Sequence, residues 1–238
     1  MPDAPRTPAP LDPVRGVFLG DLAHDLSTPL TAIHGAIELL LAGAYGPIDG
    51  EQRALVHEVL ASARELRAIV QDVADLGALD GGRLQFGVAR VNLAVIVGDL
   101  RATIGDAAGK RGVGFAIHAP DAGAPIASDE RRLRQILTCA LGYAMKASRR
   151  GSQITAQVDI QDEQLRLDVR TTGITVADPQ SLFAERRDPT PGVPKPYRGP
   201  GLGLPLVGRI VQAWGGRADA TMSDGVLVLR VQVPVHPV

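Results

Sequence analysis

Hydrophobic residues recur every three or four positions along residues 17–42, in the pattern of an amphipathic helix. The repeating positions are Phe18, Leu22, Leu26, Leu30, Ile33, Ile37 and Leu40. Residues 43–50 contain three glycines and a proline, which predict a turn. A second helical pattern follows at Leu55, Val59, Ser62 or Ala63, Leu66, Ile69, Val73 and Leu76. The two patterns predict a helical hairpin.

After residues 81–82 the pattern changes to one that mixes helices with strands of alternating hydrophobic and polar residues. The predicted elements are helices at 91–108, at 129–147 with Asp129 near its N-cap, and from about Gly203, and strands at 113–118, 152–160, 164–172 and 226–235. We therefore expect an α+β chain in which the hairpin is followed by an α/β sandwich.

The domain organisation follows from these patterns. Residues 1–15 are rich in proline and are expected to form a disordered leader. Residues 16–80 form the hairpin and residues 83–238 the sandwich. Two helices that each carry a hydrophobic stripe cannot hide both stripes against one another, so we expect a homodimeric four-helix bundle.

Composition narrows the classes of function. The formal net charge of −1 supplies no basic surplus for a phosphate backbone, so a nucleic-acid partner is not expected. The single cysteine, Cys139, excludes a disulfide framework and fits a reducing compartment. No apolar run reaches the ~18 residues of a membrane span, and no signal peptide opens the chain. We expect a cytoplasmic protein without a metal site built from clustered Cys and His.

The segment 21–30, "DLAHDLSTPL", places polar chemistry inside the first helix. At about 100° per residue, His24 lies about 160° from the leucines two positions away on either side, so it points away from the predicted core. Asp25 is expected to hold one ring nitrogen and leave the other as a nucleophile. Thr28 lies one turn further on the same face. Pro29 cannot donate to the carbonyl of Asp25, so we expect the helix to bend or loosen there.

Three segments resemble the transmitter core of bacterial sensor histidine kinases. Residues 18–35, "FLGDLAHDLSTPLTAIHG", resemble the phosphoacceptor box. Residues 128–148, "SDERRLRQILTCALGYAMKAS", resemble the helix of the asparagine box, and residues 198–216, "RGPGLGLPLVGRIVQAWGG", are similar to the glycine-rich box. The resemblance covers nearly the whole chain. It implies a dimerisation and histidine-phosphotransfer hairpin followed by an ATP-binding sandwich of the type shared with DNA gyrase and the heat-shock chaperone ATPases.

The resemblance also implies roles for individual residues. His24 is the phosphoacceptor, Asp25 assists the transfer, and Thr28 orients water when the phosphoaspartate of a response-regulator receiver domain is hydrolysed. ATP with magnesium is the implied phosphoryl donor. The implied nucleotide-binding positions are Lys146, Gly173, Arg198, Gly199, Gly201, Leu202 and Gly203.

Four substitutions depart from the family's nucleotide boxes. Where the family has an aspartate that accepts a hydrogen bond from the adenine amino group, this sequence has Thr171, and Thr175 replaces a glycine two positions after the retained Gly173. In the asparagine box, Tyr143 replaces the residue that ligates magnesium and Cys139 replaces an earlier asparagine. A phenol is a poor magnesium ligand, so we expect ATP-driven phosphorylation to be weak or absent.

Three functions are therefore open. In the first, His24 exchanges phosphoryl groups with a receiver aspartate and the sandwich has a docking or regulatory role. In the second, the chain is an ATP-dependent autokinase that tolerates unusual pocket residues. In the third, it is a noncatalytic pseudokinase scaffold. Labelling from ATP and from a phosphorylated receiver distinguishes them.

Overall fold

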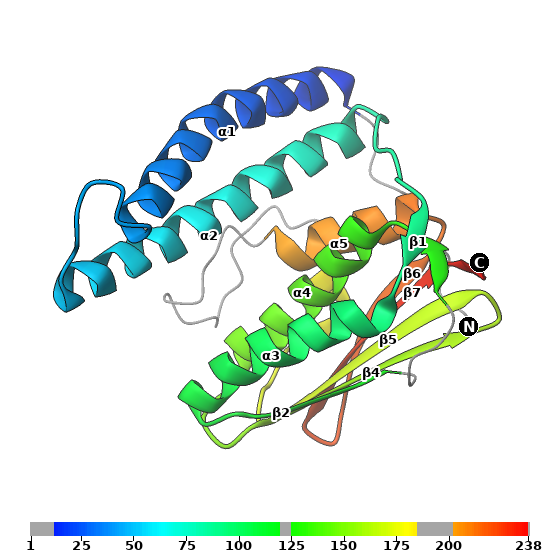
Figure 1. Cartoon of the computed structure of the whole chain (residues 1–238). Coiled ribbons are helices and arrows are strands. Elements are labelled where there is room, and N and C mark those ends of the chain that lie inside the picture. Colours follow the sequence, from blue (N-terminus) through cyan, green and yellow to red (C-terminus); the bar gives the residue numbers. More distant parts are fainter. Residues whose placement is uncertain (1–11, 120–124, 185–201, 238) are drawn as a thin grey trace. The chain divides into compact units, whose positions relative to one another are not determined.

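The chain forms two compact units that divide between Leu84 and Gln85, as seen in a computed structural model (Figure 1). The structure describes residues 12–119, 125–184 and 202–237. The division lies a few residues beyond the boundary predicted at residues 81–82. The expected order, a helical hairpin followed by a mixed α/β domain, is confirmed.

The first unit is a hairpin of two long helices, α1 (Pro13–Leu41) and α2 (Gly50–Asp80). The carboxylate of Asp12 accepts a hydrogen bond from the backbone N–H of Arg15 and caps α1. Proline suits the first helical position because it lacks an N–H that would need a partner. Helix α1 therefore begins earlier than the predicted residue 17, and residues 13–15 belong to the helix and not to a leader.

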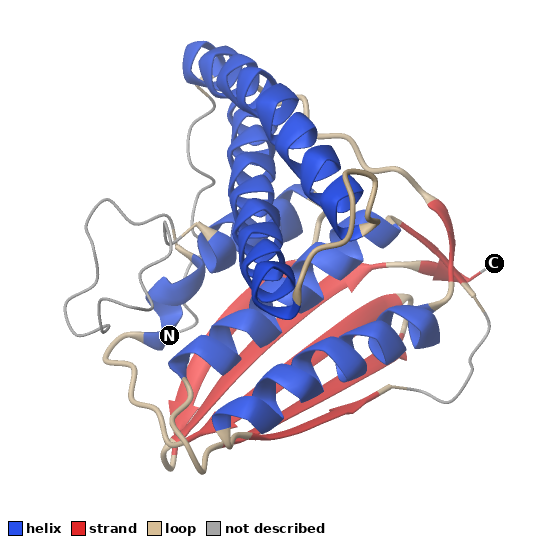
Figure 2. Ribbon diagram, turned by 60° about the vertical axis from the view of Figure 1, so that its left-hand side comes forward, coloured by secondary structure: helices blue, strands red, loops and turns tan. Residues whose placement is uncertain are grey.

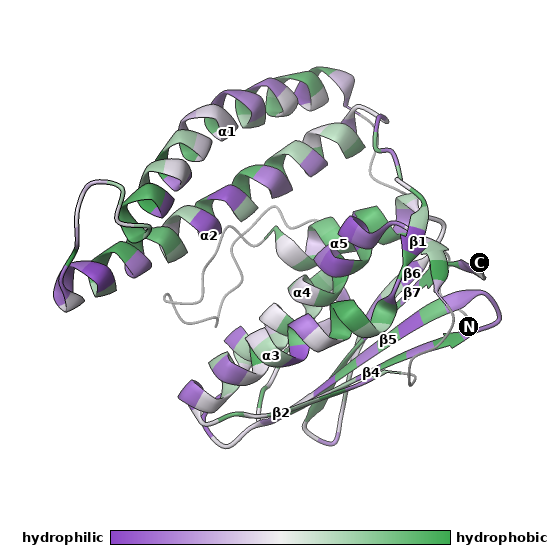
Figure 3. Cartoon of the chain, viewed as in Figure 1, coloured by the Kyte–Doolittle hydropathy of each residue, from purple (hydrophilic) through white to green (hydrophobic). Residues whose placement is uncertain are grey.

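The inward face of α1 differs from the predicted stripe. Its buried residues are spaced by seven positions: Gly16, Ala23, Leu30 and Ile37. Phe18, Leu22 and Leu26, which the periodicity placed in the core, are 64%, 39% and 42% exposed. Hydrophobic positions occur along the whole of α1 (Figure 3). Only a narrow seam faces α2, because two helices in contact bury one line of side chains each.

In its described residues, the second unit contains two sheets, three α-helices and one short 3₁₀ helix. Its elements are β1 (Ala89–Val91), α3 (Leu93–Arg111), β2 (Gly114–His118), β3 (Ile126–Ser128), α4 (Glu130–Ala147), β4 (Gln153–Gln161), β5 (Gln164–Thr172), η1 (Pro179–Phe183), α5 (Gly203–Ala213), β6 (Arg217–Ser223), β7 (Val226–Pro234) and β8 (His236–Pro237).

The larger sheet has the strand order β2-β4-β5-β7-β6. Strand β2 is parallel to β4, and the other neighbouring pairs are antiparallel. Helices α3, α4 and α5 lie over one face of this sheet (Figure 2). Every second residue of β5, and residues 154, 156 and 158 of β4, are buried toward the helices, as the alternation predicted, whereas Ile160 near the end of β4 is 37% exposed.

The core of the second unit lies between the sheet and these helices. It is made almost entirely of leucine, isoleucine, valine and alanine side chains. A second, smaller sheet has the order β1-β3-β8. Its strands have only two or three residues each, which is too short for a recognisable alternating pattern, so the sequence did not predict them. No helix in the described part of the chain is long and apolar enough to cross a membrane.

Candidate phosphoacceptor and nucleotide sites

His24 lies in the middle of α1, and its side chain is exposed, as its helical position predicted. Asp25 and Thr28 are also exposed. Because residues four apart lie on the same helical face, Thr28 stands one turn from the imidazole. The hairpin thus exposes the imidazole of His24 to solvent, and the carboxylate of Asp25 and the hydroxyl of Thr28 are exposed nearby on the same helix.

One expectation about this segment is wrong. In the described structure the Asp25 carboxylate makes no hydrogen bond to the His24 ring, because neighbouring residues on a helix project about 100° apart. Helix α1 stays helical through Pro29, and its axis curves along its length (Figure 1). The Ser27 hydroxyl donates to the carbonyl oxygen of Ala23, and the Thr31 hydroxyl donates to that of Ser27, each at 2.8 Å. These side-chain bonds occupy carbonyl groups around the proline.

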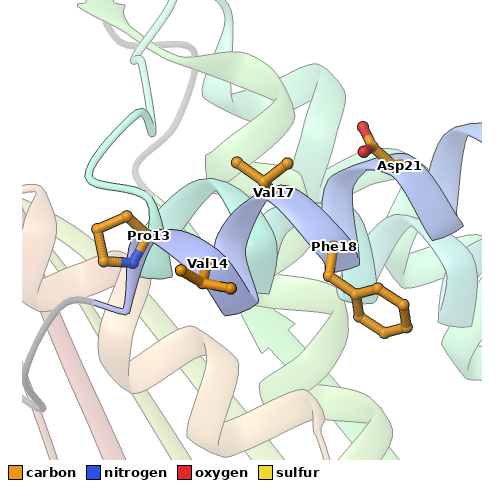
Figure 4. A pocket seen from close by; sticks show the side chains of 5 residues that line it. All are labelled: Pro13, Val14, Val17, Phe18 and Asp21. Atoms are coloured by element: carbon orange, nitrogen blue, oxygen red, sulfur yellow. The ribbon is translucent and has the colours of Figure 1, made fainter.

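The start of α1 carries exposed hydrophobic side chains. Pro13, Val14, Val17, Phe18 and Asp21 line a shallow groove there (Figure 4). Val14 is 82% exposed and Phe18, one turn further on, is 64% exposed. Exposed hydrophobic residues of the hairpin continue beyond the groove: Leu22, Leu26, Ile33 and Leu39 on α1, and Leu55, Val59 and Leu66 on α2. An apolar surface of this length is typical of an interface with another protein.

In the second unit, three positions of the asparagine-box helix share one face of α4. Cys139, Tyr143 and Lys146 are spaced by four and three residues. Cys139 and Tyr143 are half-buried and Lys146 is exposed. A Cβ placed on Gly203 would lie 3.9 Å from the Sγ of Cys139. The structure therefore brings the start of the glycine-box helix α5 beside the asparagine-box helix, as the resemblance implied.

Helix α5 begins without a side-chain cap. Leu202 occupies its N-cap position and makes no capping hydrogen bond. The first backbone N–H groups of such a helix are available to an anion. Gly203 is the first residue of the helix. Arg198, Gly199 and Gly201, which the resemblance also assigns to nucleotide binding, lie outside the described residues.

Thr171 is buried near the end of β5, with 1% of its surface exposed. Its hydroxyl oxygen has no hydrogen-bond partner among the described residues. Gly173 follows with a φ of +72°, a conformation that glycine adopts without strain. Thr175 is exposed. The family's adenine position is thus occupied by a buried hydroxyl that still has hydrogen-bonding capacity.

Ser152 belongs to the same corner, although the sequence pattern did not single it out. A Cβ placed on Gly173 would lie 2.7 Å from the Ser152 hydroxyl, so the strand end and the serine are in direct contact. Ser152 is 4% exposed, and its Oγ accepts a hydrogen bond from the backbone N–H of Arg149. A serine that precedes an alternating strand carries no sequence signal of such a contact.

The side chains at the two asparagine-box positions differ from the ligands that magnesium prefers. Magnesium prefers carboxylate and carbonyl oxygens, and the two asparagine-box positions carry a thiol and a phenol, Cys139 and Tyr143. They do not fit magnesium. The Thr171 hydroxyl is buried without a partner, and a hydroxyl oxygen retains the capacity to accept a hydrogen bond. In the described residues no three His, Cys, Asp or Glu side chains come together as a metal-binding group.

Family comparisons agree with this geometry. Residues 14–82 match the His Kinase A phosphoacceptor domain, and residues 128–237 match the histidine kinase-, DNA gyrase B- and HSP90-like ATPase family. The two matches together cover well over half of the chain. They contain His24 and the three nucleotide-box segments on α4, β5 and α5, respectively.

Similar proteins include the histidine protein kinase DivJ of Caulobacter vibrioides, which is 32% identical over 234 residues, 93% of this chain and 37% of DivJ. The crystal structure of full-length ShkA in complex with AMPPNP is similar with a TM-score of 0.68 at 24% identity, covering 94% of this chain and 46% of ShkA. The structure of histidine kinase ThkA with the response regulator TrrA has a TM-score of 0.55 at 14% identity, covering 92% of this chain and 63% of that chain.

The chain spans less than half the length of the curated relatives that it matches. Within that span, the hairpin with an exposed histidine, the mixed sheet under three helices, and both family matches occur in the order of a transmitter core. The chain therefore belongs to the sensor histidine kinases of two-component signalling, as a transmitter core with a phosphoacceptor hairpin and an ATPase-type domain.

Proposed function

We propose that this transmitter core passes phosphoryl groups between His24 and an aspartate of a response-regulator receiver domain, with little or no phosphorylation from ATP. The observation that carries the proposal is a contrast between two sites. His24, Asp25 and Thr28 are all present and exposed on α1. The nucleotide side has lost an acid at Thr171 and a magnesium ligand at Tyr143.

The proposed transfer needs only an accessible imidazole nitrogen. The ring nitrogen of His24 attacks the phosphorus of the receiver's aspartyl phosphate, a P–N bond forms, and the P–O bond to the aspartate breaks with release of the carboxylate. The reverse reaction returns the phosphoryl group. In hydrolysis, water attacks the same phosphorus and Thr28 orients it, yielding inorganic phosphate and the free carboxylate.

Loss of the hydrogen-bond acceptor for adenine should weaken nucleotide binding by an amount that can be estimated. A hydrogen bond to a charged group contributes roughly 1.5 to 3 kcal/mol, which corresponds to about a ten- to hundredfold weaker affinity. The Thr171 hydroxyl recovers part of this bond. Tyr143 should lower the rate of phosphoryl transfer from ATP further. This transfer depends on a metal that bridges and neutralises the phosphates, and a phenol is a poor ligand for that metal.

The partners proposed are a receiver domain and a second copy of the chain. The structure of ThkA holds the response regulator TrrA, and we propose a partner of the same class here. The exposed apolar residues of α1 and α2 support a homodimer through the hairpin, because a second hairpin would remove them from water. We propose a cytoplasmic location, where receiver domains are found.

Paired phosphate labelling tests the function. The full chain is incubated either with labelled ATP and magnesium or with a receiver domain carrying labelled aspartyl phosphate. We expect label on the chain from the receiver, at least tenfold more than from ATP, and its loss in His24→Ala. His34→Ala is the matched control, since His34 lies on the same helix with its Nε2 3.2 Å from Oε1 of Glu38.

Each alternative has its own outcome. Equal or greater label from ATP, absent in His24→Ala, would show an active autokinase, which the unpartnered Thr171 hydroxyl favours because it leaves an acceptor for adenine. No label from either donor, with receiver binding intact in His24→Ala, would show a noncatalytic scaffold.

A further inference from the structure

The first residues of the second unit, which follow directly after the hairpin, are held to the rest of that unit by side-chain and backbone contacts. Phe86, the second residue of this unit, stacks on Trp214 with ring centroids 4.9 Å apart and an interplanar angle of 24°. Both side chains are half-buried. Trp214 is the C-cap residue of α5. The stack therefore ties the entering chain to the end of a core helix.

The next residue makes a second attachment. The backbone N–H of Gly87 donates to the Oδ2 of Asp129 at 2.7 Å. Asp129 is 5% exposed and uses its other oxygen, Oδ1, to accept the N–H of Arg132 and cap α4. Two residues later, β1 pairs with β3 in the register Ala89↔Ser128. Three consecutive contacts thus hold the chain from residue 86 onward.

On the other side, the chain is tied to α2 as far as Arg83. The N–H of Gly82 donates to the carbonyl oxygen of Leu79, and that of Arg83 donates to Ala78 at 2.8 Å. Between Arg83 and Phe86 lie only two residues, Leu84 and Gln85. Within the described residues, neither makes a backbone hydrogen bond to the elements on either side.

We propose that the Phe86–Trp214 stack and the Gly87–Asp129 hydrogen bond form an openable clamp that sets the length of the tether between the two units. With the clamp closed, half-buried Leu84 and exposed Gln85 are the two residues between the attached segments, and they span about 7 Å at about 3.5 Å per residue. When it opens, residues 86–88 are released while β1 stays paired, and the tether spans about 17 Å. The clamp thereby controls how far the ATPase-type domain can range from the hairpin.

The arrangement suits an opening device. The stack joins the half-buried ring of Phe86 in the linker to the half-buried ring of Trp214, which packs against the edge of the aliphatic core. Gly87 adds no side chain, and a Cβ there would come no nearer than 3.8 Å to Asp129. In the proposed opening, the Phe86–Trp214 stack and the Gly87–Asp129 hydrogen bond break, while the β1–β3 pairing remains.

Two variants of the full chain test the clamp, with one matched control. Phe86→Ala removes the stack. Asp129→Asn replaces the acceptor for Gly87 with an N–H₂ group but keeps an oxygen for the α4 cap, because asparagine caps helices as well as aspartate does. Phe86→Tyr keeps a ring of the same shape and serves as the control.

Hydrogen exchange and interdomain distances are the readouts. We expect the amides of residues 86–88 to exchange at least fivefold faster in Phe86→Ala and Asp129→Asn, with β1 and the core unchanged, and Phe86→Tyr to behave as the native chain. The emission of Trp214, the single tryptophan, should shift to the red in Phe86→Ala. Spin labels at Ser62→Cys and Thr155→Cys, in a Cys139→Ser background, should show a broader distance distribution between the units.

Unchanged exchange at residues 86–88 in Phe86→Ala would overturn the proposal, because β1–β3 pairing alone would then hold the segment. Faster exchange throughout the second unit would also overturn it, since the stack would then be part of the core. None of these readouts involves a phosphoryl group, so they stand whether or not His24 exchanges phosphate.

Discussion

Gly16 and Gly77 bring the backbones of α1 and α2 into direct contact. A Cβ placed on Gly77 would lie 2.9 Å from the carbonyl oxygen of Gly16 and 2.9 Å from the backbone nitrogen of Gly20. A Cβ on Gly16 would lie 2.6 Å from the nitrogen of Gly81. Real side chains do not tolerate these separations, so the two helices can cross this closely only because glycine occupies both sides.

Gly77→Ala should therefore destabilise the hairpin. The added methyl group forces the helices apart, and overpacking of this kind costs about 1 to 3 kcal/mol. Gly35→Ala is the control, because Gly35 lies inside α1 with open space at its Cβ position, and a helical alanine there should add about 0.5 to 1 kcal/mol. Urea unfolding followed by circular dichroism measures both. Equal effects would contradict the close crossing.

Arg15 and Asp80 should stabilise the same end of the hairpin. Their side chains approach to 3.3 Å, with Asp80 3% and Arg15 46% exposed. Each charge is unfavourable by itself, because Arg15 lies near the positive end of α1 and Asp80 near the negative end of α2. Arg15→Gln should cost about 1 to 3 kcal/mol, a value reduced from that of a fully buried pair by the exposure of the arginine.

Asp80→Asn should cost less than Arg15→Gln, because it removes the buried charge itself. The exposed pair Lys110–Asp106 provides the comparison, and Lys110→Gln should change stability by at most about 0.5 kcal/mol. Denaturation curves at low and high salt separate the two pairs. A larger effect at the exposed pair would contradict the role of burial.

Glu163→Gly should stabilise the second unit. Asp162 and Glu163 form the two-residue turn between β4 and β5, with φ of 51° and 57°. Both angles are positive, as a type I′ turn requires, and glycine adopts them without the strain of a side chain. The equivalent β6–β7 turn already has this chemistry, Asp224 followed by Gly225. We expect a gain of about 1 kcal/mol in thermal unfolding. A loss would show that the Glu163 side chain contributes more than the strain costs.

Thr171→Val should raise the stability of the second unit by about 1 kcal/mol, because it replaces a buried hydroxyl that has no partner with a methyl group. Thr172→Val is a matched control of opposite sign. Its hydroxyl accepts a hydrogen bond from the N–H of Gln153 at 2.9 Å, so the same change should cost about 0.5 to 1.5 kcal/mol. Chemical denaturation of both variants decides whether the hydroxyl of Thr171 is unsatisfied in the free chain.

Thr171→Asp should strengthen ADP binding about ten- to hundredfold, because a carboxylate at this position accepts the adenine amino group. Adding Tyr143→Asn should make the binding depend on magnesium, since an amide oxygen is a suitable ligand. Calorimetric titration of the native, single and double variants measures both effects. Unchanged affinity in folded variants would remove the reason for expecting weak autophosphorylation.

The hydrophobic pattern of the sequence predicted most of the long helices and strands. Long elements such as α2, α4 and β5 repeat their hydrophobic pattern over many residues. A period of about 3.6 residues for a helix, or 2 for a strand, is easier to recognise when it repeats more often. The exposure of His24 followed from the same periodicity. The prediction used Leu22 and Leu26 as the buried face, and these two residues are 39% and 42% exposed, so the outcome was right although the buried seam is formed by other residues.

The periodicity could not decide which hydrophobic residues are buried within one chain. The predicted stripe contained Leu30 and Ile37, which are buried, and also Phe18 and Leu26, which are exposed. Hydrophobicity marks every surface that leaves water, whether against α2 or against another molecule, and a single sequence carries no sign of which one.

The sequence by itself determined the order of the α-helices and of strands β2, β4, β5 and β7, the exposed histidine, and the residue types at positions 171 and 143, because each depends on local periodicity or on residue identity. Only the tertiary structure decided that glycines interlock the hairpin, that the Thr171 hydroxyl is unpartnered, and that Phe86 meets Trp214. These contacts join residues tens of positions apart, and their energies depend on distances that only the folded chain creates.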